Sequence, residues 1–165
     1  MPIGIGALNG IINMSKLVAL FSDPDFLNQV PCEKILYPAN SVILQEDDQG
    51  QELFLINSGE VEVSYKLNED EHLAPARLTR LKAKEFFGEL SVFDSGPRSA
   101  QVIAVADCEV FKVNGPKLIA YLDAHPAKGY FVLRELFMHV VKYMRLNNLR
   151  TKLALELYFH EHADD

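Results

Sequence analysis

The chain has 165 residues, of which 48% are hydrophobic, so it can bury one core but not two independent ones. Its formal net charge of −7, without a long run of Lys and Arg, argues against a nucleic acid as the main partner. Cys32 and Cys108 are far apart and outside any metal-ligand spacing, which argues against a disulfide framework or a zinc site and fits a cytoplasmic location.

The first 14 residues are apolar and rich in glycine. They lack the positively charged start and the cleavage site of a signal peptide, and they are shorter than the roughly 20 apolar residues of a membrane span. We therefore expect an arm over residues 1–14 that packs on the domain or on a partner chain, with contact to a membrane surface as the less favoured alternative.

The spacing of apolar residues along the chain predicts two short helices followed by many short strands. Ser15 can cap a helix over 15–21, and Pro24 can begin a second helix that ends near residue 29. Strands are then predicted at 33–37, 41–45, 53–57, 60–65, 77–81, 101–106 and 109–113. The acidic segment 68–75 is expected to be a surface loop. Such strands predict a mainly β fold with flanking α-helices, an antiparallel jelly-roll barrel.

The strand over 60–65 shows the clearest alternation of the chain. Its pattern places Val61, Val63 and Tyr65 on the inner face, and Glu62 and Ser64 on the outer face. The preceding turn at 57–59 ends in glycine, so the strands on either side are expected to form an antiparallel hairpin.

The last third of the chain changes to a helical period. Asn114 can cap a helix that runs to about residue 124, and a long helix is expected to follow the break at 125–126 and to continue well past residue 150. The sequence thus divides into an arm (1–14), a barrel with short flanking helices (15–124), and a long C-terminal helix with a polar tail (125–165).

Apolar residues of the long helix recur at a spacing of 4, 3 and 4: Leu133, Phe137, Val140 and Met144. This spacing is typical of a helix packed on another helix. Because a barrel of this size cannot cover so long a helix, we expect a homodimer formed through it. The alternative is a single helix that lies along the barrel.

Residues 86–100 combine groups that suit a sugar phosphate. Gly88 stands where a strand would pass into a short helix, whose first N–H groups carry partial positive charge. Arg98 can donate paired, charge-assisted hydrogen bonds to a phosphate, and the Ser99 hydroxyl can donate another. The alternative for Arg98 and Glu89 is an ordinary ion pair on a loop.

The segments 87–90 (FGEL) and 97–100 (PRSA) resemble the phosphate-binding cassette of cyclic nucleotide-binding domains, and the resemblance covers most of the chain. It implies a cyclic nucleotide ligand, with cAMP favoured over cGMP. In the family the arginine, here Arg98, anchors the phosphate, and the glutamate, here Glu89, accepts a hydrogen bond from the ribose 2′-OH. The cassette residues expected at the ligand are Gly88, Glu89, Leu90, Arg98, Ser99 and Ala100.

The pocket for the base departs from the family in several places. Val63, Leu78 and Thr79 align with it, and Tyr143 of the long helix could either stack on the purine or simply pack against the barrel. Met144 is expected in the helix seam. Lys84-Glu85 replaces the family's glycine-acid pair, so the choice between cAMP and cGMP stays open on the sequence.

The leading hypothesis is a stand-alone, non-enzymatic sensor that passes ligand binding through its C-terminal helix to an unidentified effector protein. The alternative is a dimeric scaffold that has lost the ligand, with Tyr143 filling the base pocket. Transcription factors of the family carry a helix-turn-helix domain after the long helix, and because the chain ends at Asp165 no DNA binding is expected.

A metal-dependent cupin enzyme on a similar jelly roll is the remaining hypothesis. It would need inward-facing histidine and glutamate ligands on strands. The five histidines instead lie in predicted loop, helix or tail: His72, His125, His139, His160 and His162. No metal is therefore expected, and a metal at residues 160–162 is less favoured than a solvated tail.

Overall fold

The computed structural model describes residues 15–65 and 76–161. The arm over 1–14, the loop over 68–75 and the last residues of the tail, including His162, lie outside them. The described strands are β1 (Cys32–Tyr37), β2 (Val42–Leu44), β3 (Glu52–Ser58), β4 (Glu60–Tyr65), β5 (Ala76–Lys82), β6 (Phe86–Phe87), β7 (Gln101–Ala104) and β8 (Cys108–Asn114).

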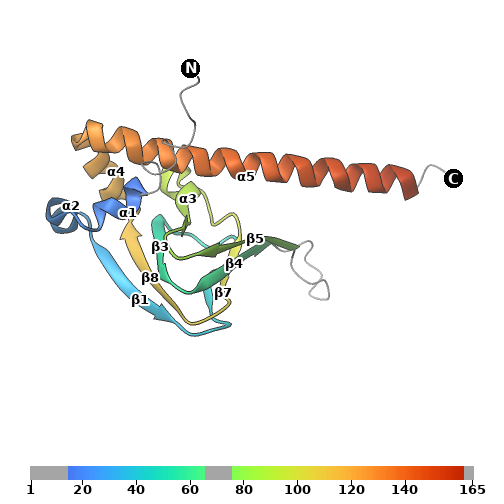
Figure 1. The fold of residues 1–165 in the computed structure, drawn as a ribbon, viewed down its shortest axis with the longest axis horizontal. Helices are drawn as coiled ribbons and strands as arrows, with labels where there is room; N and C mark the ends of the chain where they lie inside the picture. The colour runs from blue at the N-terminus through green and yellow to red at the C-terminus, as the bar shows by residue number, and fades with distance from the viewer. Residues whose placement is uncertain (1–14, 66–75, 162–165) are drawn as a thin grey trace, which may run out of the picture.

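The strands form two four-stranded antiparallel sheets that curve around each other (Figure 1). One sheet has the order β1-β8-β3-β6 and the other has the order β2-β7-β4-β5. The chain turns at Gly59, which has a φ of 94°, but the antiparallel hairpin expected around this turn is wrong. β3 pairs with β6 and β8, and β4 pairs with β5 and β7 in the other sheet, so the turn connects the two sheets. The turn residues determine where the chain reverses, whereas strands distant in the sequence determine the pairing. The predicted fold class, an antiparallel jelly roll with flanking helices, is confirmed.

The described helices are α1 (Lys16–Leu20), α2 (Pro24–Gln29), α3 (Glu89–Asp94), α4 (Gly115–Ala124) and α5 (Pro126–Glu161). The predicted caps are present: the Ser15 hydroxyl accepts from the N–H of Val18 at 3.1 Å, and Asn114 Oδ1 accepts from the N–H of Lys117 at 3.0 Å. The side chains therefore satisfy N–H groups that have no partner within the helix.

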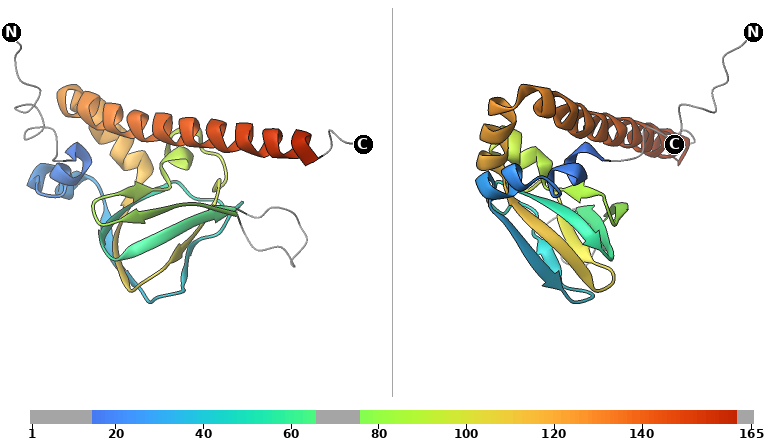
Figure 2. Two further views of the ribbon diagram at one scale, coloured as in Figure 1. Left: turned by 45° about the vertical axis from the view of Figure 1, so that its right-hand side comes forward. Right: turned by 60° about the vertical axis from the view of Figure 1, so that its left-hand side comes forward.

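Two apolar clusters hold these elements together, and β3 lies between them. Leu53 and Leu55 pack with α1, α2, α4 and the start of α5, whereas Phe54 and Ile56 face the interior of the barrel. Burial of both faces explains why β3 reads as a continuous apolar run instead of an alternating one. Figure 2 shows α1, α2 and α4 gathered at one end of the barrel.

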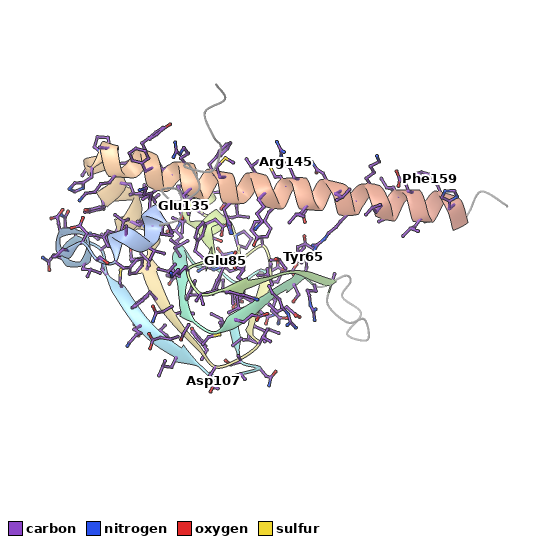
Figure 3. The ribbon with its side chains drawn as sticks, in the orientation of Figure 1. Tyr65, Glu85, Asp107, Glu135, Arg145 and Phe159 are labelled. Atoms are coloured by element: carbon purple, nitrogen blue, oxygen red, sulfur yellow. The ribbon has the colours of Figure 1, made fainter. Side chains whose placement is uncertain are left out.

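The long helix α5 crosses the barrel and projects beyond it (Figure 1). It has 36 residues and so is about 54 Å long. Glu135 Oε2 accepts from the backbone N–H groups of Lys16 and Leu17, at 2.7 and 3.1 Å, and this joins α5 to the start of α1. The side chains of residues 148–160 are exposed, and Phe159 lies on the projecting end (Figure 3). No helix in the described ranges is long and apolar enough to span a membrane.

The predicted alternation of β4 fails at its second half. The register between β4 and β5 shifts between Val63 and Ser64, which is a β-bulge. Ser64 was expected to point outward, and this is wrong: the side chain is buried, with 2% of its surface exposed. A bulge inserts one extra residue into a strand and reverses the faces beyond it, and the local pattern of residue types does not reveal it.

Gly115 at the start of α4 packs against the backbone of the loop before β3. Its N–H donates to the carbonyl of Gln51, and a Cβ added at residue 115 would overlap that oxygen. We therefore expect Gly115→Ala to lower the free energy of unfolding by about 1–3 kcal/mol, measured by urea denaturation. Gly96→Ala is the matched control, because the atoms nearest to its Cβ would be those of the flexible Asp94 carboxylate. Equal effects of the two substitutions would contradict this packing.

Candidate functional site

A cavity of about 270 Å³ lies between the barrel, the segment over residues 86–100 and α5. Nine of the ten residues that the sequence singles out line it: Val63, Leu78, Gly88, Glu89, Leu90, Arg98, Ser99, Ala100 and Tyr143. Thr79 does not line the cavity. Met144 does, at the rim, with 58% of its surface exposed. The fold thus brings together segments far apart in the sequence.

Gly88 makes the transition from β6 to α3 possible. Its φ of 80° lies in the left-handed region, which side chains disfavour. A Cβ at this position would come within 2.9 Å of the Glu52 carbonyl oxygen and 3.0 Å of Arg98 Nη1. Glycine therefore serves both the turn and the close approach of Arg98 to the backbone.

The Arg98 guanidinium is buried, with 4% of the residue exposed, and it is held at fixed geometry. Nη1 donates to the carbonyl oxygens of Glu52 and Gly88, at 2.9 and 3.2 Å, and Nη2 donates to Glu52 Oε2 at 2.8 Å. These three bonds leave Nε–H and one Nη2–H, out of five donors, as groups that can serve a ligand. The guanidinium also lies over the Phe54 ring, 5.7 Å from its centroid.

Burial lowers the pKa of Arg98 from its ordinary value, and the nearby Glu52 carboxylate opposes that shift. The main chain of Arg98 is fixed as well: its N–H donates to the Asp48 carbonyl at 2.8 Å, and its carbonyl accepts from the N–H of Asp47 at 2.9 Å. The loop before β3 therefore holds the backbone of Arg98, and Glu52, the first residue of β3, pairs with its charge.

Glu89 is the first residue of α3 and is also buried, with 8% of its surface exposed. Its Oε1 lies 3.4 Å from Nδ1 of His139 on α5. The alternative reading of the sequence was an ion pair between Arg98 and Glu89. Within the described part of the chain, these two side chains do not pair with each other. Arg98 is paired with Glu52 and Glu89 with His139, so each charge has its own position on the cavity wall.

Tyr143 closes the cavity from the α5 side and packs partly against the barrel interior. The Thr79 side chain on β5 is close enough to the Tyr143 hydroxyl to oppose the rise of its pKa. Burial, together with the negative charges of Glu85 and Glu89, raises the pKa of Tyr143 to about 12. The phenol is therefore neutral at physiological pH and presents a ring face and a hydroxyl. Figure 3 shows Glu85 and Tyr65 on the barrel beneath α5.

Two residues at this site were missed on the sequence, His139 and Glu52. His139 stands four residues before Tyr143, one helical turn away, so the helical period alone places it on the same face. On the sequence, His139 was weighed only as a possible metal ligand. Glu52 opens an apolar strand, and nothing in its neighbours indicates that it pairs with a residue 46 positions later.

The chemistry of this cavity is that of a binding site for a small anion with an apolar part. Buried Arg98 supplies a fixed positive charge, Glu89 supplies a hydrogen-bond acceptor, and Val63 and Leu78 belong to a largely apolar opposite wall. Among the described residues, no group of three His, Cys, Asp or Glu side chains could hold a metal ion.

Comparison with known proteins agrees with this description. Residues 34–125 match the family model of the cyclic nucleotide-binding domain, which is more than half of the chain. The chain therefore belongs to the cyclic nucleotide-binding domain family.

Two curated relatives illustrate the family. The cAMP-activated global transcriptional regulator CRP of Haemophilus influenzae is 32% identical over 106 residues, which are 64% of this chain and 46% of that protein. The cAMP-dependent protein kinase regulatory subunit of Aspergillus fumigatus is 37% identical over 81 residues, which are 49% of this chain and 18% of that protein. The chain thus spans less than half the length of either relative.

Among solved structures, the catabolite activator protein of Thermus thermophilus superposes with a TM-score of 0.66 at 25% identity. The superposition covers 89% of this chain and 62% of that one. The two sheets and the long C-terminal helix of this chain therefore follow a known jelly-roll arrangement.

The contribution of the Glu52–Arg98 pair to the stability of the fold can be measured. In Glu52→Gln the buried guanidinium loses its charged partner but keeps the neutral acceptors, so we expect the free energy of unfolding to fall by about 1.5–3 kcal/mol. Glu156→Gln is the control, because Glu156 pairs with Lys152 on the exposed surface of α5. Urea denaturation measures both variants. An unchanged stability of Glu52→Gln would contradict the structural role of this pair.

Proposed function

We propose that this chain is a non-catalytic sensor that binds a cyclic nucleotide in the cavity at Arg98 and passes the binding event to a partner through α5. The single observation that carries this proposal is the buried Arg98, fixed by Glu52 and Gly88 with two N–H groups left for an anion. A cyclic phosphate is such an anion, since it keeps one negative charge throughout the physiological pH range.

Each part of a cyclic nucleotide has a counterpart in the cavity. The phosphate accepts from Arg98 and Ser99, and the ribose 2′-OH donates to the Glu89 carboxylate. The base lies against Val63 and Leu78 on one side and under Tyr143 on the other. The cavity volume of about 270 Å³ is close to the lower end of the roughly 300–1,000 Å³ typical of small-molecule pockets, which suits a compact mononucleotide.

We favour cAMP over cGMP as the ligand. Both curated relatives are named for cAMP, one as cAMP-activated and the other as cAMP-dependent. The cassette of this chain is compatible with either nucleotide, and the residues around the base, above all Tyr143, decide between them.

The proposed route to the effector protein runs through α5. Glu89 and Thr79 contact α5 through His139 and Tyr143, so a ligand at the cassette changes the contacts of the helix directly. A homodimer through α5 is part of the proposal. It is supported by large exposed apolar residues along the helix, including Leu133, Phe137 and Met144. The cytoplasm is the proposed location, consistent with two free cysteines.

A dimeric scaffold that has lost the nucleotide is the second candidate. The observation that favours it is the position of Tyr143, which lines the cavity and packs against the barrel interior, across the region proposed for the base. In the sensor, Tyr143 has to stack on the purine or move aside. In the scaffold, it stays in place as part of the core.

The role of Arg98 is tested by calorimetric titration of the full chain with cAMP and cGMP. We expect Arg98→Ala to weaken the affinity by at least about tenfold, because hydrogen bonds to a charged group contribute about 1.5–3 kcal/mol. Arg80→Ala is the matched control, since Arg80 pairs with Glu60 and Glu62 on the outside of the barrel. Thermal unfolding confirms that each variant is folded. Equal affinities of parent and Arg98→Ala would refute the assignment.

The homodimer is tested by analytical ultracentrifugation at micromolar concentration. The parent is expected to sediment as a dimer, and Phe137→Glu as a monomer, because a carboxylate cannot be buried unpaired in an apolar seam. Leu36→Glu on β1 is the control: Leu36 is similarly exposed, at 72% against 65% for Phe137, but lies on the barrel. A monomeric parent, or a dimeric Phe137→Glu, would count against pairing through α5.

A further inference from the structure

His139 connects the cassette to the long helix through an imidazole that is almost enclosed. Its Nδ1 lies 3.4 Å from Glu89 Oε1, and the exposed fractions of the two side chains are only 13% and 11%. The ring also packs on Phe86, with 4.3 Å between the ring centroids, and meets Tyr143 edge to face at 4.7 Å. His139 thus contacts both the proposed ribose acceptor and the proposed base contact.

The second ring nitrogen of His139 has no hydrogen-bond partner. Nε2 is the one buried side-chain nitrogen or oxygen without a partner within the described residues. An imidazolium has two N–H donors, so the charged ring would leave one donor unsatisfied here, and a buried donor without an acceptor is unfavourable. A charged ring at this position therefore needs compensation by further negative charge, which an anionic ligand in the cavity can supply.

The charges facing His139 are balanced. From α3 comes Glu89, and Arg98 lies across the cavity. A second space beside the ring is lined by Lys84 and Glu85 from the turn before β6 and by Glu135 and Lys142 from α5 itself. The charged groups are thus three acids (Glu85, Glu89 and Glu135) and three bases (Lys84, Arg98 and Lys142), with neutral Tyr143 as the other titratable neighbour. An anionic ligand tips this balance toward negative charge.

We propose that His139 is the positioning residue for Glu89, and that its imidazole takes up a proton when a cyclic nucleotide binds, so that affinity rises as the pH falls. This inference rests on the proposed function. A carboxylate has lone pairs for several donors, so Glu89 can accept from His139 and from a ribose hydroxyl at the same time. The positive ring then compensates the ligand's charge and links the ligand to α5.

The sign of the pH dependence follows from linkage. A ligand that stabilises the protonated ring binds more tightly where protons are available, and imidazole is the side chain that changes charge between about pH 5 and pH 8. We expect the affinity for cAMP to increase about fivefold from the upper to the lower end of that range, the lower limit of typical coupling between two sites. Outside that range the affinity levels off.

The test is calorimetric titration of the full chain with cAMP and with cGMP across this pH range, in two buffers that differ in ionisation enthalpy. The difference between buffers gives the number of protons taken up on binding. We expect the parent to take up a fraction of a proton near the middle of the range. His139→Gln keeps a hydrogen-bond donor but cannot be charged, and should bind with no proton uptake and a flat pH profile. His139→Arg carries a permanent charge, and should bind with a flat profile at an affinity close to that of the parent at low pH.

His125→Gln is the matched control. His125 pairs with Asp25 at 3.3 Å at the junction of α2, α4 and α5 and does not line the cavity, so its substitution should leave proton uptake unchanged. Proton uptake that persists in folded His139→Gln or His139→Arg, or its absence in a parent that binds the nucleotide, overturns this inference alone. A parent that binds neither nucleotide at any pH overturns the proposed function and this inference with it.

Discussion

The buried guanidinium of Arg98 is the constraint on which the site depends. A charge at this depth is stable only with several fixed partners, and these come from two separate segments: Glu52 at the start of β3 and Gly88 before α3. The main chain of Arg98 is bonded in addition to the backbone of Asp47 and Asp48. Because the partners sit on strands and tight turns of the barrel, the fold sets the direction of the remaining N–H groups. The cavity is therefore organised for an anion before one arrives.

The long helix α5 forms another wall of the cavity that contains Arg98. The helix covers the cavity with His139 and Tyr143, which touch Glu89 and Thr79, while its first half is fixed to the core through Glu135 and the N-terminus of α1. One end of α5 is thus firmly attached, its middle contacts Glu89 of the cassette, and its exposed end projects from the barrel (Figures 1 and 2). Such a helix can carry a local change of charge to a distant surface.

The sequence predicted those features that depend on local chemistry. Capping by Ser15 and Asn114, the glycine transition at Gly88 and the period of α5 all involve residues within a few positions of one another. Features that depend on tertiary contacts were not predictable. The bulge beside Ser64 arises from pairing between β4 and β5, and the Glu52–Arg98 pair joins residues 46 apart. His139 was accessible through its spacing from Tyr143, but its meaning appears only when α3 brings Glu89 against it.

Binding of a cyclic nucleotide at Arg98 is tested by a thermal-shift comparison of cAMP, cGMP and linear 5′-AMP with the full chain. A ligand that binds only the folded protein stabilises it by mass action, by about 2.7 kcal/mol at a hundredfold excess over its Kd. We expect a concentration-dependent rise of Tm with at least one cyclic nucleotide and a clearly smaller one with 5′-AMP. An unchanged Tm with both cyclic nucleotides, or an equal rise with the linear nucleotide, would contradict it.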